Sequence, residues 1–194
     1  MQSFVNVLAA FVIGLGLLQA PAEAAPLRVM MLGDSLTAGY GLPPEQALPV
    51  QLEQALKKAG LDVRVLNAGV SGDTTAGGLA RLDWSLAEKP DIVLVGLGAN
   101  DALRGLDPER AYANLDTILT RLQAKGIRTM LLGMLAPPNL GSDYGRRFAA
   151  IYERLAEKHK VPLYPFLLDG VAAQAKLNQP DGIHPNAECV AAIV

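Results

Sequence analysis

Short apolar runs alternate along the chain with longer stretches in which apolar residues recur at helical spacing. The runs predict five buried β-strands, near Leu27–Leu32, Val63–Leu66, Ile92–Val95, Arg128–Gly133 and Pro162–Tyr164. Helices are predicted from Pro49 to Gly60, over Leu79–Leu86 and stopping before Pro90, from Asp107 to Gly126, and around Phe148–Leu155. Strands that alternate with helices predict a parallel sheet covered on both faces. Because crossover connections are right-handed, we expect a single doubly wound α/β sandwich of about five parallel strands.

The first residues carry a different pattern. Phe4–Leu18 is almost wholly apolar and runs into Ala22-Glu23-Ala24. This apolar core is short for a membrane span, which needs about 20 residues, and its small-x-small ending is the kind that signal peptidase recognises. We therefore interpret residues 1–24 as a signal peptide cleaved after Ala24, which leaves residues 25–194 as one periplasmic or secreted domain. Because Met1-Gln2-Ser3 carries no Lys or Arg, an uncleaved anchor is the alternative.

Composition and charge narrow the classes of function. A chain of 194 residues, 51% hydrophobic and 19% charged, is typical of a globular protein with one domain. The formal net charge of −2 lacks the basic excess of a nucleic-acid binder. Cys189 is the one cysteine, which excludes a disulfide within the chain and a cysteine-cluster zinc site, and we interpret it as buried. We expect a monomer with no cofactor, no metal, no nucleic-acid partner and no membrane span after cleavage.

Polar residues that directly follow strands are the candidates for chemistry, because open α/β sheets bind ligands beyond the carboxyl ends of their strands. Four segments are of interest: Gly33–Leu36, Asn67–Thr74, Gly98–Asp101 and, after the last short strand, Asp181–Pro185. Ser35 is the candidate nucleophile, provided that a base reaches it. His184 is the candidate base, since Asp181 three residues earlier can hold its Nδ1 and leave Nε2 free. His159 lies at a charged helix end, and we interpret it as a solvated residue.

Acyl transfer also needs hydrogen-bond donors for the oxyanion that develops on the carbonyl oxygen. Gly72 can offer its backbone N–H, Asn100 its side-chain amide, and Ser35 its own N–H as the third donor. Taken alone, Gly72 fits a turn and Asn100 fits a helix cap. Their positions after successive strands favour the catalytic interpretation.

These residues resemble those of the SGNH (GDSL-type) serine hydrolases. The resemblance rests on GDSL at Gly33–Leu36, Gly72 in NAGVSGDTT, Asn100 in GLGAND, and Asp181 with His184 in DGIHPN, in the family's order. Stretches such as GDSLTAGYG and VPLYPF look like the periplasmic branch of acyl-CoA thioesterases, lysophospholipases and arylesterases. The resemblance implies a flavodoxin-like sheet, no metal, and hydrolysis of esters and thioesters through an acyl-Ser35 intermediate. Relatives in this branch usually continue through a longer final helix, so we expect the last helix here to be short.

The substrate is less constrained than the reaction. Ala102–Leu106 and the Ala136–Arg147 loop are expected to wall an acyl pocket, as these regions do in the branch that the chain resembles. The residues predicted to contact substrate are Asp34, Asp101, Leu103, Leu106, Pro137 and Tyr144, and Leu135 and Leu140 would also suit an aliphatic chain. Each of these leucines, taken singly, fits the core as well.

Other functions fit the sequence less well. The chain lacks the Gly-x-Ser-x-Gly elbow of other serine hydrolases, a complete Gly-x-Gly-x-x-Gly motif, and the GxxxxGK[ST] phosphate-binding loop. A non-catalytic binding module on the same fold is the alternative, and it predicts the loss of Ser35, Asp181 or His184. All three are present.

Overall fold

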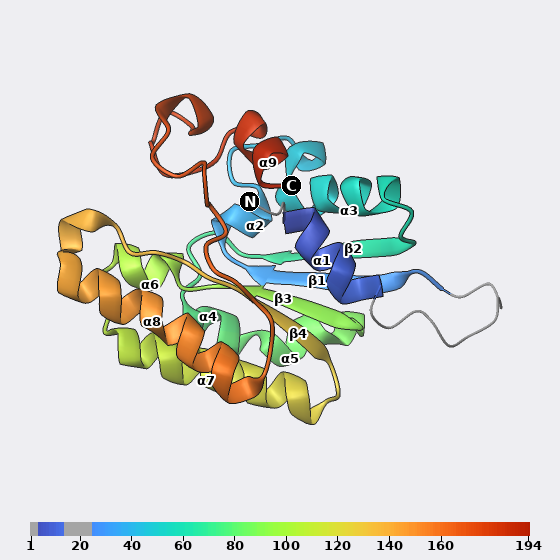
Figure 1. The fold of residues 1–194 in the computed structure, drawn as a ribbon, viewed down its shortest axis with the longest axis horizontal. Helices are drawn as coiled ribbons and strands as arrows, with labels where there is room; N and C mark the ends of the chain where they lie inside the picture. Colours follow the sequence, from blue (N-terminus) through green and yellow to red (C-terminus); the bar gives the residue numbers. More distant parts are fainter. Residues whose placement is uncertain (1–3, 14–24) are drawn as a thin grey trace.

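The centre of the molecule is a five-stranded sheet, seen in a computed structural model that describes residues 4–13 and 25–194 (Figure 1). The strands are β1 (Leu27–Gly33), β2 (Val63–Gly69), β3 (Ile92–Gly96), β4 (Arg128–Leu132) and β5 (Leu163–Tyr164). All neighbouring pairs are parallel, in the order β2-β1-β3-β4-β5. Every residue of β3 is buried, as expected for a strand covered on both faces. The predicted parallel sheet is confirmed.

Helices cover both faces of this sheet (Figure 1). On one side lie α1 (Phe4–Ile13), α3 (Leu48–Lys58) and α9 (Ala187–Ile193); on the other lie α4 (Thr75–Ala80), α5 (Leu82–Ser85), α7 (Pro108–Ala124) and α8 (Ser142–His159). Two short helices, α2 (Ser35–Ala38) and α6 (Ala99–Leu103), follow the ends of β1 and β3. Asp107 caps α7 by accepting a hydrogen bond from the backbone N–H of Glu109, as its position before a proline predicts. The doubly wound sandwich is confirmed.

The helix predicted over Leu79–Leu86 is broken at Arg81. α4 ends at Ala80, Arg81 adopts φ −100° and ψ 4°, and α5 begins at the next residue. The guanidinium of Arg81 donates hydrogen bonds to the carboxylate of Asp73 and the backbone oxygen of Gly33. These tertiary contacts outweigh the local helical pattern.

Two expectations about the region around α8 also need correction. The segment 136–147 is not a loop throughout, because Pro138–Leu140 forms a 3₁₀ turn and α8 begins at Ser142. His159 is buried rather than solvated. Its Nε2 lies 2.6 Å from Asp116 Oδ1 and its Nδ1 lies 3.0 Å from Gln123 Oε1, both on α7. The charges around it in sequence do not reveal that α7 packs over the end of α8.

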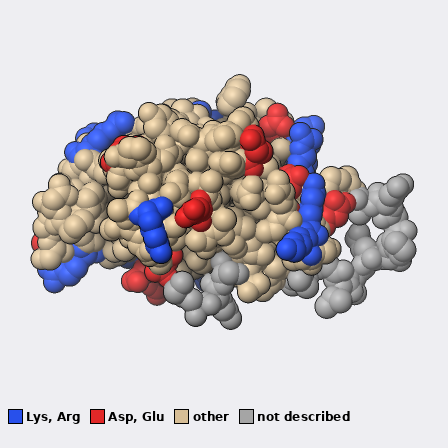
Figure 2. All heavy atoms as spheres, turned by 90° about the horizontal axis from the view of Figure 1, so that it is seen from above, with Lys and Arg blue, Asp and Glu red and all other residues tan. Residues whose placement is uncertain are grey.

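The predicted signal peptide lies partly outside the described residues, and so does its cleavage site after Ala24. Its described part, α1, packs against α3 and buries Leu8. Within residues 4–13 and 25–194, no helix is long and apolar enough to cross a membrane. Cys189 is buried, as predicted. The face drawn in Figure 2 carries acidic and basic side chains in small groups on a largely uncharged surface.

A row of glycines crosses the carboxyl ends of three neighbouring strands, β2, β1 and β3. In the strand register Gly33 of β1 pairs with Gly69 of β2 and with Gly96 of β3. A Cβ on Gly69 would collide with the backbone nitrogen of Ala38, and a Cβ on Gly33 would collide with Thr37 Oγ1. The absence of these side chains lets α2 lie directly against the strand ends.

We expect Gly69→Ala to destabilise the protein by about 1–3 kcal/mol, because the added methyl group meets backbone that cannot rotate away. Gly145→Ala is the matched control. Gly145 lies within α8, and no atom beyond its own neighbourhood in the helix lies within 4 Å of the added Cβ, so alanine there should stabilise the protein by about 0.5–1 kcal/mol. Urea unfolding of both variants measures the difference, and equal effects would contradict this account of the strand ends.

Candidate active site

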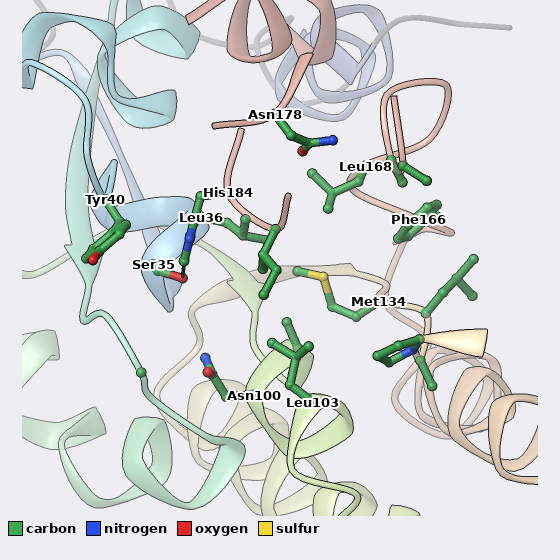
Figure 3. Close-up of a pocket in the computed structure, with 18 of the residues that line it drawn as sticks. Ser35, Leu36, Tyr40, Asn100, Leu103, Met134, Phe166, Leu168, Asn178 and His184 are labelled. Atoms are coloured by element: carbon green, nitrogen blue, oxygen red, sulfur yellow. Dashed lines mark hydrogen bonds between the residues drawn. The ribbon is translucent and has the colours of Figure 1, made fainter. Parts of the chain in front are cut away.

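Three residues from two distant segments of the chain meet at the carboxyl ends of the strands. Ser35, the first residue of α2, has its Oγ 2.9 Å from Nε2 of His184 (Figure 3). His184 Nδ1 lies 2.6 Å from Oδ2 of Asp181. Ser35 and His184 are separated by 149 positions in the sequence. The predicted nucleophile, base and carboxylate therefore form one continuous chain of hydrogen bonds.

The carboxylate of Asp181 is held in place by its own loop. Its Oδ1 accepts the backbone N–H of Ile183 at 2.9 Å and that of His184 at 3.0 Å. The backbone N–H groups of His184 and Ile183, together with the His184 ring, lower the pKa of Asp181 to about 2. The carboxylate is therefore ionised at neutral pH, and it orients the imidazole so that Nε2 faces Ser35.

The ring of Tyr40 packs against the imidazole of His184, a contact that the sequence did not predict. The two ring centroids are 4.5 Å apart and their planes meet at 37°. Tyr40 is half exposed and lies shortly after α2. An aromatic residue near Ser35 is visible in the sequence, but its contact with a loop so distant along the chain is not.

The three candidate oxyanion donors, Ser35, Gly72 and Asn100, line the same cavity as His184. Gly72 lies in the turn after β2 with φ +84°, and its backbone oxygen accepts Arg104 Nη2 at 2.8 Å. Asn100 lies in the first turn of α6, after β3. Its Nδ2 donates to the backbone oxygen of Asp73 at 2.9 Å and lies 3.4 Å from Oδ2 of Asp34. The second distance is near the limit of a hydrogen bond, so one N–H of the amide is only weakly engaged.

Two predicted substrate contacts, Asp34 and Asp101, are instead buried residues that position the helices of the site. Asp34 caps α2 by accepting the backbone N–H of Leu36 at 3.0 Å. Burial raises the pKa of Asp34 to about 6. Asp101 accepts the backbone N–H of Thr75 at 2.8 Å and its hydroxyl at 2.7 Å, which ties α6 to α4. Neither carboxylate lines the cavity at Ser35.

The cavity beside Ser35 has a volume of about 600 Å³ and mostly apolar walls. Leu103 and Pro137 line it as predicted, and so does Leu135. Leu106, Leu140 and Tyr144 do not line it, although Tyr144 donates its hydroxyl proton to the backbone oxygen of Leu106 at 2.7 Å.

Three further residues that the sequence analysis missed, Met134, Phe166 and Leu168, also line this cavity (Figure 3). Each lies a few residues beyond the end of β4 or β5. Their position after a strand is therefore the signal that could have identified them.

The described residues contain no cluster of three or more His, Cys, Asp or Glu side chains that could hold a metal ion. The polar side chains that line the cavity are Ser35, Tyr40, Ser71, Asn100, Asn178 and His184.

Comparison with known proteins agrees with this geometry. Residues 31–192 match the model of the GDSL-like Lipase/Acylhydrolase family. The chain is 42% identical to the esterase TesA of Pseudomonas aeruginosa over 172 residues, 88% of this chain and 86% of that protein. It is 40% identical to the thioesterase 1/protease 1/lysophospholipase L1 of Escherichia coli K12, over 85% of this chain and 78% of that protein.

A solved structure also resembles this fold. The crystal structure of AlinE4, an SGNH-hydrolase family esterase, is 47% identical and superposes with a TM-score of 0.80. The match covers 87% of this chain and 91% of that one.

Asp34→Asn is expected to reveal the cost of ionising a buried carboxyl group. The folded-state pKa of about 6 lies above the ordinary value of 3.8, so the folded protein holds its proton to a higher pH than the unfolded chain. Folding stability from this group therefore falls as the pH rises from about 4 to about 7, by up to about 3 kcal/mol. The asparagine side chain has no proton to lose, so the variant should gain stability relative to the native protein over that range.

Urea unfolding of both proteins at pH 4.5 and pH 7.5 measures this difference. A stability difference that is the same at both pH values would contradict the assignment.

Proposed function

The chain belongs to the GDSL-like lipase and acylhydrolase family, and from that premise we propose that it is a serine hydrolase that cleaves carboxylic esters and acyl thioesters. The observation that carries the proposal is the hydrogen-bonded chain from Ser35 through His184 to Asp181 at the mouth of an apolar cavity. A non-catalytic binding module would need the cavity but not this chain of hydrogen bonds. The names of the relatives, an esterase and a thioesterase with lysophospholipase activity, support both kinds of substrate.

The reaction begins with proton transfer from Ser35 to His184. As Oγ attacks the carbonyl carbon, Nε2 takes the hydroxyl proton, and the carboxylate of Asp181 stabilises the imidazolium that forms. The carbonyl oxygen becomes an oxyanion that accepts the N–H groups of Ser35 and Gly72 and the side-chain amide of Asn100.

The second half of the reaction releases both products. The C–O or C–S bond breaks, and the leaving group takes the proton from His184, which leaves an acyl-Ser35 ester. Water then attacks this ester with His184 as base, and the products are the free acid and the regenerated serine.

The acyl group fits the cavity on chemical grounds. Its walls run from Ser35 past Leu103 and Met134 to Phe166 and Leu168 (Figure 3). These side chains offer apolar contact and few hydrogen-bonding partners, which suits an aliphatic chain. We therefore infer that substrates carry an aliphatic acyl group.

A fluorophosphonate probe tests the nucleophile directly. Mass spectrometry should find one adduct, on the peptide that carries Ser35, and Ser35→Ala should abolish both labelling and hydrolysis. Ser71→Ala is the matched control, because Ser71 supplies another hydroxyl at the same cavity and should not affect labelling of Ser35. An adduct on a different residue, or active enzyme that resists the probe, would contradict the proposal.

Asn100→Ala should lower kcat by about 10²–10³-fold with little change in KM, because negative charge on the carbonyl oxygen develops only in the transition state. Asn100→Asp should be at least as damaging, since it removes the donor and adds a carboxylate beside the oxyanion. Turnover per titrated active site, measured beside Tm, checks this result. If the folded alanine variant keeps most of its kcat, Asn100 is a structural residue and the oxyanion role is wrong.

We also propose that the protein is exported and that residues 1–24, α1 included, are removed on the way. The apolar segment Phe4–Leu18 and the small residues before Ala25 support this proposal. Edman sequencing of the exported protein should begin at Ala25-Pro26-Leu27. A membrane-bound product that still begins at Met1 would show instead that the segment is an anchor.

A further inference from the structure

Arg81 is a charged side chain that does not line the cavity, yet it is mostly buried beside it. Its side chain is 16% exposed, at the break between α4 and α5. Nε donates to Asp73 Oδ2 at 2.6 Å, Nη2 donates to the backbone oxygen of Gly33 at 2.9 Å, and Nη1 donates to Ser85 Oγ at 3.2 Å. The guanidinium thus joins α5 to the last residue of β1 and to the segment that follows β2.

A candidate oxyanion donor lies close to each of these two contacts. Gly33 stands two residues before Ser35, and its backbone oxygen accepts the N–H of Val70 at 3.1 Å as well as the guanidinium of Arg81. The contact between Arg81 and Gly33 is therefore close along the chain to the Ser35 N–H.

Asp73, the second residue that Arg81 contacts, lies next to the other two donors. Asp73 directly follows Gly72, and its backbone oxygen accepts the side-chain amide of Asn100 at 2.9 Å. A Cβ on Gly77 would lie 2.6 Å from Asp73 Oδ1, so the absence of a side chain at Gly77 leaves room for the carboxylate beside Arg81. Arg81 therefore contacts one residue near each donor. Gly33 stands two residues before Ser35, and Asp73 both follows Gly72 and accepts the amide of Asn100.

We propose that Arg81 is a positioning residue that sets the spacing of the three oxyanion donors. This inference rests on the proposed serine hydrolase function. The donors act only if each lies about 2.7–3.1 Å from an oxygen that carries charge in the transition state, so small displacements of either loop weaken catalysis. A planar guanidinium holds two acceptors at fixed angles, whereas a lysine ammonium is a point charge on a flexible stem.

Arg81→Lys is the central experiment, with kcat, KM and Tm measured on enzyme whose active sites are titrated. We expect kcat to fall by about 10–10²-fold while KM stays within about twofold, because only the charge-bearing transition state uses the donors. Arg121→Lys is the matched control, since Arg121 contacts Asp83 at 3.5 Å on the exposed surface and should leave both constants unchanged. A residue with a purely structural role would lower Tm without lowering the kcat of the folded enzyme.

Two further measurements give the proposal independent tests. In Arg81→Ala, added guanidinium at non-denaturing concentration should restore part of the lost kcat. Combining Arg81→Lys with Asn100→Ala should cost less than the product of the two single effects, because both changes act on the same hydrogen bonds. If Arg81→Lys does not fold, Asp73→Asn should show the same selective loss of kcat.

The outcomes separate this inference from the proposed function. A folded Arg81→Lys or Asp73→Asn enzyme with native kcat, or fully multiplicative effects with Asn100→Ala, would overturn the positioning role while fluorophosphonate labelling of Ser35 stood. Failure of the native enzyme to label at Ser35 would overturn the proposed function itself.

Discussion

The close approach of α2 to the ends of β1 and β2 is the contact on which the site depends. It exists because Gly33 and Gly69, neighbours in the strand register, carry no side chain where the Thr37 side chain and the backbone of α2 pass. Ser35 begins α2, so this contact holds the serine Oγ at the carboxyl edge of the sheet. β3 ends beside the same edge and delivers Asn100, since parallel strands all point their carboxyl ends the same way. A sheet edge widened by side chains would separate these groups.

Burying polar groups at this edge is unfavourable unless each finds a partner. Asp34 is bonded to the backbone N–H of Leu36, Asp101 to both polar groups of Thr75, and Asp73 to Arg81. The hydroxyl of Thr75 also accepts the side-chain amide of Asn114 on α7, which extends the network into the body of the protein. These bonds compensate for desolvation and fix the loops that follow β1, β2 and β3. The raised pKa of Asp34 indicates that its hydrogen bonds compensate only in part for its burial.

The features that short stretches of sequence determine were predicted correctly. The apolar runs and helical spacings identified the strands and the long helices, and the order of Ser35, Asn100 and Asp181-x-x-His184 along the chain identified residues that meet at one edge. Contacts between remote segments were not predictable in this way. The break at Arg81, the burial of His159 and the packing of Tyr40 on His184 all depend on a side chain reaching a different element. The inner cavity wall, Phe166 and Leu168 included, depends on where the chain passes after β5.

The central claim is that the ends of three strands present three N–H donors to one oxygen beside Ser35. A crystal structure of the covalent adduct with a small alkylphosphonate tests it most directly, because its phosphoryl oxygen stands where the oxyanion would form. The account predicts phosphorus bonded to Ser35 Oγ, with one oxygen about 2.7–3.1 Å from the Ser35 N–H nitrogen, the Gly72 N–H nitrogen and Asn100 Nδ2. A phosphoryl oxygen directed into solvent or toward Tyr40, with these donors still bonded to the protein, would contradict it.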